Sequence, residues 1–322
     1  MAKLKLALYW AAACGGCDVA VLDINERILK VAELADLLLW PVALDFKYRH
    51  VEAMPDGHID VCLFNGAVRN SENEHVARLL RKKSKVLVAF GSCAYMGGIP
   101  GLANFFSRRE VLQHVYSDTA STVNPGGTVP LEKVRIPAGE LELPTFFQRV
   151  RTLDQVVLVD YYLPGCPPVV DQVWAVIEAI AAGNLPPPGS VVGASDSALC
   201  DECERKKDEK KIKQFRSVAT YRPDPETCLL EQGVICCGPA TRAGCGAKCV
   251  KANMPCRGCY GPPPGVTDQG AKMLSAVASV VDSDDPAEVE RIISQIQDPA
   301  GTFYRFSLPS SLLNGAHRKE IA

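Results

Sequence analysis

The sequence has 322 residues, which is enough for about two ordinary domains. Lys and Arg together number 35 and Asp and Glu 37, so the formal charge is only −2. This near balance argues against a nucleic-acid-binding protein, which would carry a basic domain or patch. Hydrophobic residues make up 47% and charged residues 22%, a composition that excludes intrinsic disorder of the whole chain.

The amino-terminal segment raises the question of export. Lys3 and Lys5 precede an apolar run that ends in small residues before Cys14, which loosely imitates a secretory signal peptide. We interpret the run as a buried first strand instead, since cleavage would separate it from the cysteine pair that follows. No apolar run is long enough for a membrane-spanning helix. The sequence therefore predicts a cytoplasmic protein whose thiols stay reduced.

Short apolar runs bounded by turn residues predict the strands of the first half. These runs are 4–10, 59–64, 85–90 and 155–160. A further apolar stretch over 37–45 is broken by Pro41.

Helical patterns lie between these runs. Apolar residues at helical spacing cover 18–35, and Ser71 with Glu74 three residues later forms a capping box. A third helix, after the last strand, reaches Ala182 and is closed by Gly183. Strands separated by helices predict an α/β fold with a doubly wound parallel sheet.

Turn-rich segments divide the rest of the chain. Residues 95–150 form a long insertion that we expect to be functional or to face a partner. The run 186–189 marks a boundary. Beyond it, the charged tract Arg205–Lys213 is either a solvated face or a docking surface for an acidic electron-transfer partner. Two helices are expected near the end, over 267–281 and from Asp285 onward.

The sequence contains 14 cysteines, and four of them share one predicted position in the fold. Each follows a predicted strand, and they are Cys14, Cys17, Cys93 and Cys166. Because ligands of open α/β sheets bind at the carboxyl edge of the strands, we expect these four thiols to meet there. Four thiolates are the ligand set of a 4Fe–4S cluster. Cys62 lies inside a strand, and we predict that it is a core residue.

Nine further cysteines lie within the 60 residues from Cys200 to Cys259. Eight of them divide along the chain into two sets of four, namely Cys200, Cys203, Cys228 and Cys236, and then Cys245, Cys249, Cys256 and Cys259. The ninth, Cys237, is predicted not to be a ligand, although spacing alone allows Cys236 and Cys237 to exchange roles.

Two tetrahedral zinc sites would use the same eight residues, so spacing alone leaves zinc and iron open. The first set of four, which does not resemble a zinc ribbon, favours iron. The sequence has no P-loop, no dinucleotide-binding glycine motif and no nucleophile elbow, and its five histidines form no spaced ligand set. We therefore predict a chain that carries electrons and does not convert a substrate by itself.

Several motifs resemble those of a known family. Cys14-Gly15-Gly16-Cys17, Gly91-Ser92-Cys93 and Pro164-Gly165-Cys166-Pro167-Pro168 resemble the proximal-cluster motifs of nickel–iron hydrogenase small subunits. The segments 228–249 and 253–259 are similar to the cytoplasmic branch of that family. Within it, the match is to the methyl-viologen-reducing, non-deazaflavin-reducing type, which works with heterodisulfide reductase. The resemblance extends from Lys5 to Gly265.

The resemblance implies a flavodoxin-like domain, a cluster domain and three 4Fe–4S clusters. We expect the flavodoxin-like domain over 1–190 and the irregular iron–sulfur domain over 191–265, and the helical patterns that follow predict a short helical extension over 266–322. The resemblance assigns the proximal cluster to Cys14, Cys17, Cys93 and Cys166, the medial cluster to Cys245, Cys249, Cys256 and Cys259, and the distal cluster to Cys200, Cys203, Cys228 and Cys236. In this pattern Cys236, and not Cys237, is the ligand.

The sequence also departs from the family. Ala13 and Asn65 stand where many relatives have carboxylates, so neither position offers one beside the proximal cluster. The nickel motif of the large subunit is missing, because Asp298-Pro299 is followed by Ala300. Hydrogen would therefore be split on another chain.

The resemblance also implies partners. They are a nickel–iron large subunit, a small iron–sulfur adaptor and a heterodisulfide-reductase-like acceptor complex. Two alternatives stay open at this point. The chain could serve a hydrogenase-derived complex that has lost nickel, or it could be a zinc-stapled adaptor without a redox role.

Overall fold

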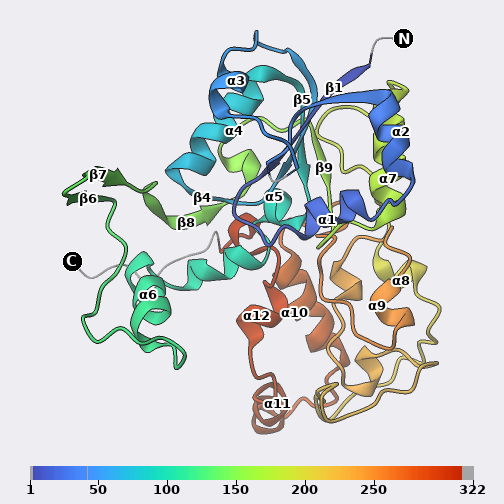
Figure 1. Ribbon diagram of the computed structural model, residues 1–322. Helices are drawn as coiled ribbons and strands as arrows, with labels where there is room; N and C mark the ends of the chain where they lie inside the picture. Colours follow the sequence, from blue (N-terminus) through green and yellow to red (C-terminus); the bar gives the residue numbers. More distant parts are fainter. Residues whose placement is uncertain (1–2, 42, 314–322) are drawn as a thin grey trace.

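The computed structural model describes residues 3–41 and 43–313, and within these ranges a five-stranded parallel sheet forms the centre of the first half (Figure 1). Its strands, in spatial order, are β2 (Ala35–Leu39), β1 (Leu4–Trp10), β3 (Ile59–Asn65), β5 (Ser84–Phe90) and β9 (Tyr161–Leu163). Numbered along the chain, this order is 2-1-3-4-5, that of flavodoxin-like folds. The predicted α/β fold with a doubly wound parallel sheet is confirmed.

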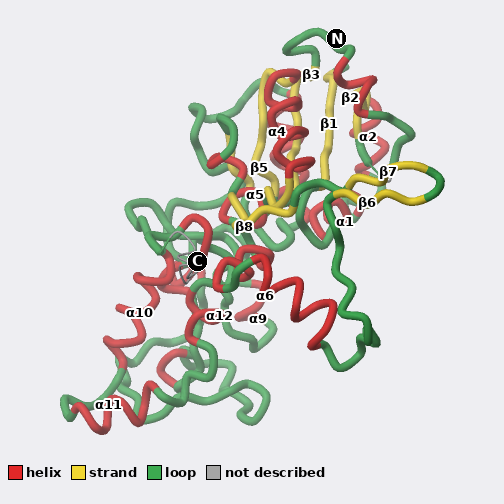
Figure 2. Tube along the Cα trace, turned by 90° about the vertical axis from the view of Figure 1, so that its left-hand side faces the viewer, coloured by secondary structure: helices red, strands yellow, loops and turns green. Residues whose placement is uncertain are grey.

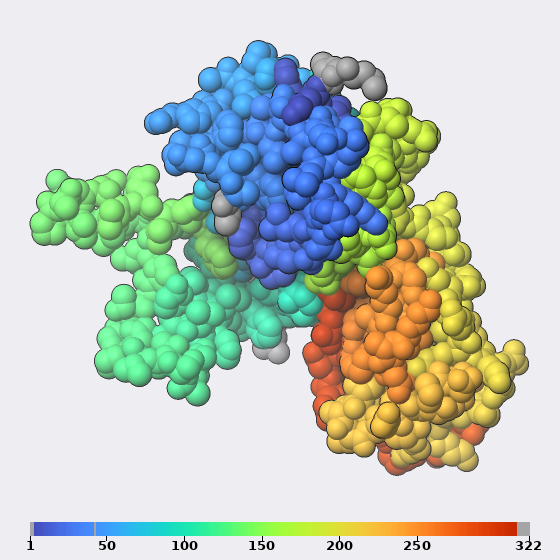
Figure 3. Space-filling model, turned by 45° about the vertical axis from the view of Figure 1, so that its right-hand side comes forward, coloured from blue at the N-terminus to red at the C-terminus, as the bar shows by residue number. Residues whose placement is uncertain are grey.

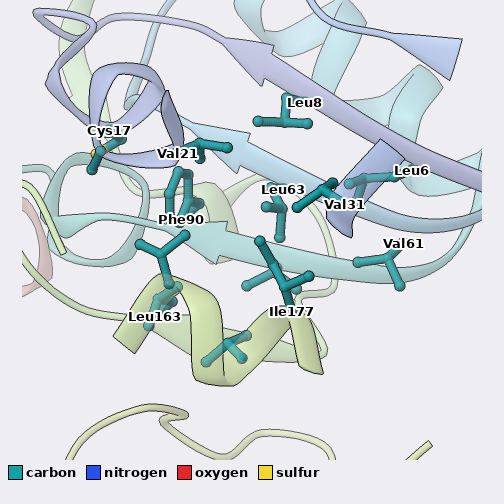
Figure 4. Packing of buried hydrophobic residues seen from close by; sticks show 14 of the residues in the cluster. Leu6, Leu8, Cys17, Val21, Val31, Val61, Leu63, Phe90, Leu163 and Ile177 are labelled. Atoms are coloured by element: carbon teal, nitrogen blue, oxygen red, sulfur yellow. The ribbon is translucent and has the colours of Figure 1, made fainter. Parts of the chain in front are cut away.

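Helices cover both faces of the sheet, so alternate side chains of each strand enter different cores. On one face Leu8, Leu63 and Phe90 pack against Val31 and Ile177 (Figure 4). The helices on that side are α1 (Gly16–Leu22), α2 (Arg27–Leu34) and α7 (Val170–Ala181). The other face packs against α3 (Tyr48–Glu52), α4 (Ser71–Lys83) and α5 (Ser92–Met96).

The side chain of Cys62 belongs to this second core. It lies in β3 and is 0% exposed. The prediction that Cys62 is a core residue is therefore confirmed.

Three local predictions were wrong in detail. The helix expected over 18–35 is two helices, because the chain turns between them and Asn25 adopts a left-handed conformation with φ of 55°. The cap of α4 is Asn70, whose side chain accepts the backbone N–H of Asn73, and not Ser71.

The last strand was also misplaced. It was expected over 155–160 but lies at Tyr161–Leu163, and a 3₁₀ turn occupies Leu153–Gln155. The Asp160 carboxylate accepts hydrogen bonds from Arg81 and from the backbone of Leu87, which holds the chain outside the ladder until Tyr161 pairs with Val88.

The long insertion forms an arm that projects from the body of the molecule (Figures 1 and 3). It begins with the 3₁₀ helix η1 (Ile99–Phe105) and continues through α6 (Arg108–Gln113) and a π-helical turn, His114–Asp118. A hairpin of β6 (Lys133–Ile136) and β7 (Gly139–Glu142) follows. The chain then returns through β8 (Phe146–Arg151), which pairs antiparallel with β4 (Val68–Asn70).

The cysteine-rich segment and the carboxyl-terminal helices share one hydrophobic core at the opposite end from the sheet (Figure 2). Leu199 and Val250 from the cysteine-rich segment pack with Met273 and Phe303. The elements here are α8 (Leu199–Glu202), η4 (Leu230–Gln232), η5 (Gly238–Ala240), α9 (Lys248–Lys251), α10 (Gln269–Val280), α11 (Pro286–Ile293), α12 (Pro299–Phe303) and η6 (Leu308–Ser310).

The two predicted carboxyl-terminal helices are α10 and α11, which Asp268 and Asp285 cap, whereas α12 was not predicted. The boundaries at 190 and 265 stay predictions, and 314–322 of the predicted extension lie outside the described residues. Among the helices that the structure describes, none is long and apolar enough to cross a membrane.

The central sheet gives the first testable prediction. Leu63 is 2% exposed in the middle strand, so Leu63→Ala should destabilise the protein by about 2–5 kcal/mol through lost burial and a cavity. Leu22→Ala is the control, because Leu22 is 55% exposed. Urea unfolding of the anaerobically purified chain, followed by circular dichroism, measures both. Equal effects of the two substitutions would contradict this packing.

Candidate metal centres

Three strands deliver four cysteines to the carboxyl edge of the sheet. Cys14 and Cys17 follow β1, Cys93 is the second residue of α5, which begins shortly after β5, and Cys166 follows β9. The backbone N–H of Gly91 donates to Leu163, and that of Ser92 donates to Gly165, so the loops after β5 and β9 are tied together. The shared edge that the sequence predicted is therefore present.

The four thiols of this edge are close enough to act on one another electrostatically. Burial raises the pKa of the Cys17 thiol, and Cys93, Cys166 and Cys14 raise it further. Burial raises the pKa of Cys93 to about 12, with smaller contributions from Cys166 and Cys14. In the opposite direction, the backbone N–H of Ile99 donates to Cys93 and lowers its pKa. No positively charged group is among the causes of these two pKa shifts. A bound cation would therefore favour the thiolate forms.

Glycines let the backbone approach these thiols. A Cβ on Gly91 would lie 2.3 Å from the Cys17 sulfur, and one on Gly98 would lie 2.5 Å from the Cys93 sulfur. Both glycines have positive φ, 83° and 57° respectively. The backbone N–H of Gly16 donates to the Cys14 sulfur at 3.4 Å.

A carboxylate that sequence reasoning missed lies beside Cys17. Asp18 accepts hydrogen bonds from the Trp40 indole at 2.9 Å and from the Asn65 amide at 2.7 Å. Its charge raises the pKa of the Cys17 thiol. Neither Ala13 nor Asn65 provides a carboxylate, but the Asn65 amide donates the hydrogen bond that helps to hold the Asp18 carboxylate in place. The position of Asp18 next to a predicted ligand was the available indication.

The second group of thiols lines one cavity of about 290 Å³. Cys200, Cys203, Cys228 and Cys236 contribute to its wall, together with Lys207. The pKa of the Cys200 thiol is raised to about 12, mainly by burial. The positive charge of Lys207 acts against this rise, and the other three cysteines add to it. Backbone N–H groups of Gly238 and Cys256 donate to Cys236, the latter at 3.3 Å.

The third group is less compact. Cys245 and Cys249 act on Cys259, whose pKa burial raises to about 12. The pKa of Cys256 is also raised by burial, but the cysteines that act on it most are Cys236 and Cys237. Cys256 thus lies against the second group of thiols, while Cys259 lies against Cys166 of the first.

Glu202 is a second carboxylate that sequence reasoning missed. It accepts the backbone N–H groups of Gly244 and Gly246, at 3.2 and 2.9 Å, and raises the pKa of Cys245. It supports the turn that carries this cysteine.

The remaining candidates differ in their surroundings. Cys237 is buried, and its thiol faces the carbonyl of Thr302. In the charged tract, Arg205 is buried and donates to the carbonyls of Asp224 and Thr227, so it is a structural residue and not part of an open surface. Lys207 is exposed beside the second group of thiols. Among the described residues, no group of three or more His, Cys, Asp and Glu side chains is arranged to hold a single metal ion.

Comparisons with known proteins identify the family. The family model described as NADH ubiquinone oxidoreductase, 20 Kd subunit, matches residues 14–180. The chain is 41% identical over 317 residues to the iron-sulfur subunit of the F420-non-reducing hydrogenase of Archaeoglobus profundus, covering 97% of this chain and 98% of the relative. It is 37% identical over 323 residues to a subunit of the F420-non-reducing hydrogenase of Methanothermobacter marburgensis, covering 99% and 98%.

A solved structure shows the same fold. The nickel–iron–selenium hydrogenase of Desulfovibrio vulgaris Hildenborough contains a chain that is 16% identical, with a TM-score of 0.52, and the match covers 82% of this chain and 95% of that one. With full-length relatives at this identity, the chain belongs to the family of F420-non-reducing hydrogenase iron–sulfur subunits, the electron-transferring small subunits of nickel–iron hydrogenases.

Proposed function

We propose that this subunit carries electrons through three 4Fe–4S clusters in the cytoplasm. The proximal cluster would be held by Cys14, Cys17, Cys93 and Cys166, the medial one by Cys245, Cys249, Cys256 and Cys259, and the distal one by Cys200, Cys203, Cys228 and Cys236. Each cluster, when bound, accepts and donates one electron at a time.

The surroundings of the thiols support this assignment. Backbone N–H groups donate to a thiol of every set, as those of Ile99, Gly258 and Gly238 do to Cys93, Cys256 and Cys236. Such donors favour the thiolate over the thiol and tune the potential of a bound cluster. The close approach of Gly91 and Gly98 leaves no room for side chains beside the first set.

The single observation that carries the proposal is a pair of hydrogen bonds that join the three sets. The backbone N–H of Cys166, in the first set, donates to Cys259 in the third. The backbone N–H of Cys256, three residues before Cys259, donates to Cys236 in the second set. The segment Cys256–Cys259 therefore touches both neighbouring sets, as the medial position in a chain of three clusters requires.

The order of the three sets along the proposed electron route indicates which set would face each partner. A hydrogenase small subunit works with a large subunit, and in this proposal the nickel–iron site of that large subunit delivers electrons to the sheet edge. The distal set, with the exposed Lys207 beside it, would pass them to a small iron–sulfur adaptor and a heterodisulfide-reductase-like complex.

Replacing one proximal ligand tests the route. In the purified complex, Cys14→Ser should lower hydrogen-dependent reduction of the acceptor by about tenfold or more while nickel stays in the large subunit, because only the first electron-transfer step is damaged. Cys62→Ala is the control, since Cys62 is buried in the sheet. Undiminished acceptor reduction by Cys14→Ser would contradict the proximal assignment.

The glycine cradle gives a second test. Gly91→Ala places a Cβ 2.3 Å from the Cys17 sulfur, so we expect iron per chain to fall. Gly127→Ala is a matched control, because Gly127 also has positive φ but its Cβ would meet nothing within 4 Å. Iron and acid-labile sulfide are measured on both variants. Equal iron content in Gly91→Ala and Gly127→Ala would show that Gly91 does not limit a cluster at this edge.

A further inference from the structure

A polar cavity of about 570 Å³ lies in the cysteine-rich lobe. Its walls come from four separate segments, 214–221, 234–235, 255–257 and 295–305. Three of these segments contribute one arginine each, and these are Arg216, Arg257 and Arg305. The fold thus brings together three guanidinium groups that are far apart in the sequence.

These three positive charges are not balanced within the described part of the chain. No salt bridge joins any of them to a carboxylate among residues 3–41 and 43–313. Asp298 is the one acidic side chain among the described lining residues, and its carboxylate accepts the backbone N–H of Gly301 to cap α12. The cavity therefore carries an excess of about two positive charges.

Two of the arginines have hydrogen-bond donors to spare. The Nε atom of Arg305 is buried and has no hydrogen-bond partner among the described residues. No described side chain accepts a hydrogen bond from Arg257. Arg216 lies 4.5 Å from the ring centroid of Tyr221 and can donate to the Gln214 amide oxygen. Removing a guanidinium group from water without giving it an acceptor costs free energy, which an anion within the cavity would offset.

We propose that this cavity binds a small phosphate-bearing anion. Planar guanidinium groups match the oxygens of phosphate in pairs, and a doubly charged anion would balance the excess charge. The volume lies within the range of small-molecule sites, about 300–1,000 Å³. Ser217, Thr220 and Gln297 add neutral donors to the lining.

The cavity adjoins the proposed medial and distal sets. Arg257 follows Cys256 directly in the sequence. The pKa of the Cys237 thiol is raised to about 12, mainly by burial, and the positive charges of Arg257 and Arg305 act against this rise. Cys237 lies against Cys236 and Cys256, one from each set. An anion here would cancel positive potential at both, so electrons would be held less tightly and the midpoint potentials of those clusters would fall. This consequence rests on the proposed function, whereas the binding itself does not.

The test is the binding of pyrophosphate to the anaerobically purified complex, measured by isothermal titration calorimetry. We expect binding to the native complex and a loss of about tenfold or more in affinity for Arg305→Gln, the size of one charge-assisted hydrogen bond. Arg222→Gln is the matched control, because Arg222 is exposed on the same segment as Arg216 but does not line the cavity. Its affinity should equal that of the native complex.

Two further measurements make the outcome decisive. Malonate, a dicarboxylate with two negative charges near neutral pH, should bind more weakly than pyrophosphate. Redox titration followed by electron paramagnetic resonance should show lower cluster potentials with pyrophosphate in the native complex and no shift in Arg305→Gln.

The contradicting results are distinct. No binding of pyrophosphate to the native complex, equal binding by Arg305→Gln, or a preference for malonate would each overturn the phosphate site. A preparation with little iron that still binds pyrophosphate through Arg305 would overturn the proposed function and leave the phosphate site standing.

Discussion

The arrangement of the whole molecule depends on the meeting of three strand ends. β1, β5 and β9 run parallel, so their carboxyl ends fall on one edge although Cys14 and Cys166 are far apart in the sequence. The hydrogen bonds from Gly91 to Leu163 and from Ser92 to Gly165 fix the loops at that edge. The first four thiols can therefore meet only if the sheet has formed, which couples this site to the core of the fold.

The cysteine-rich lobe is fastened to the same edge. The Ser92 hydroxyl donates to the carbonyl of Cys259, and the Tyr260 hydroxyl bonds to Gln172 of α7. Gly98 donates its backbone N–H to the carbonyl of Phe306, so the end of the described chain also returns to this junction. These contacts hold the first and third sets of thiols beside each other, as the proposed electron transfer between them requires.

Local patterns were sufficient where burial alone decides the structure. The apolar runs over 59–64 and 85–90 became the central strands β3 and β5, and the Cys62 side chain lies in the core between β3 and the helices on one face of the sheet. Long-range contacts decided what the patterns missed. Hydrogen bonds from Arg81 and Leu87 to the Asp160 carboxylate place the start of the last strand after Asp160. The helical spacing over 18–35 gave no indication of the left-handed turn at Asn25.

The same distinction applies to the sites. The shared edge of the first set followed from the order of strands and cysteines. The contact of Cys256 with Cys236, and the placement of Asp18 by Trp40 and Asn65, join segments that have no relation in the sequence. So does the meeting of Arg216, Arg257 and Arg305 in one cavity. Such arrangements can be identified only in the folded structure.

We propose that three sets of four thiols hold iron–sulfur clusters that connect a nickel–iron partner to an acceptor. The most direct measurement is the content of iron, acid-labile sulfide, zinc and nickel in the complex purified without oxygen. We expect about 12 iron and about 12 sulfide for each copy of this chain, with nickel in the copurifying large subunit. About two zinc with little iron would contradict it and make the cysteine-rich lobe a structural zinc module.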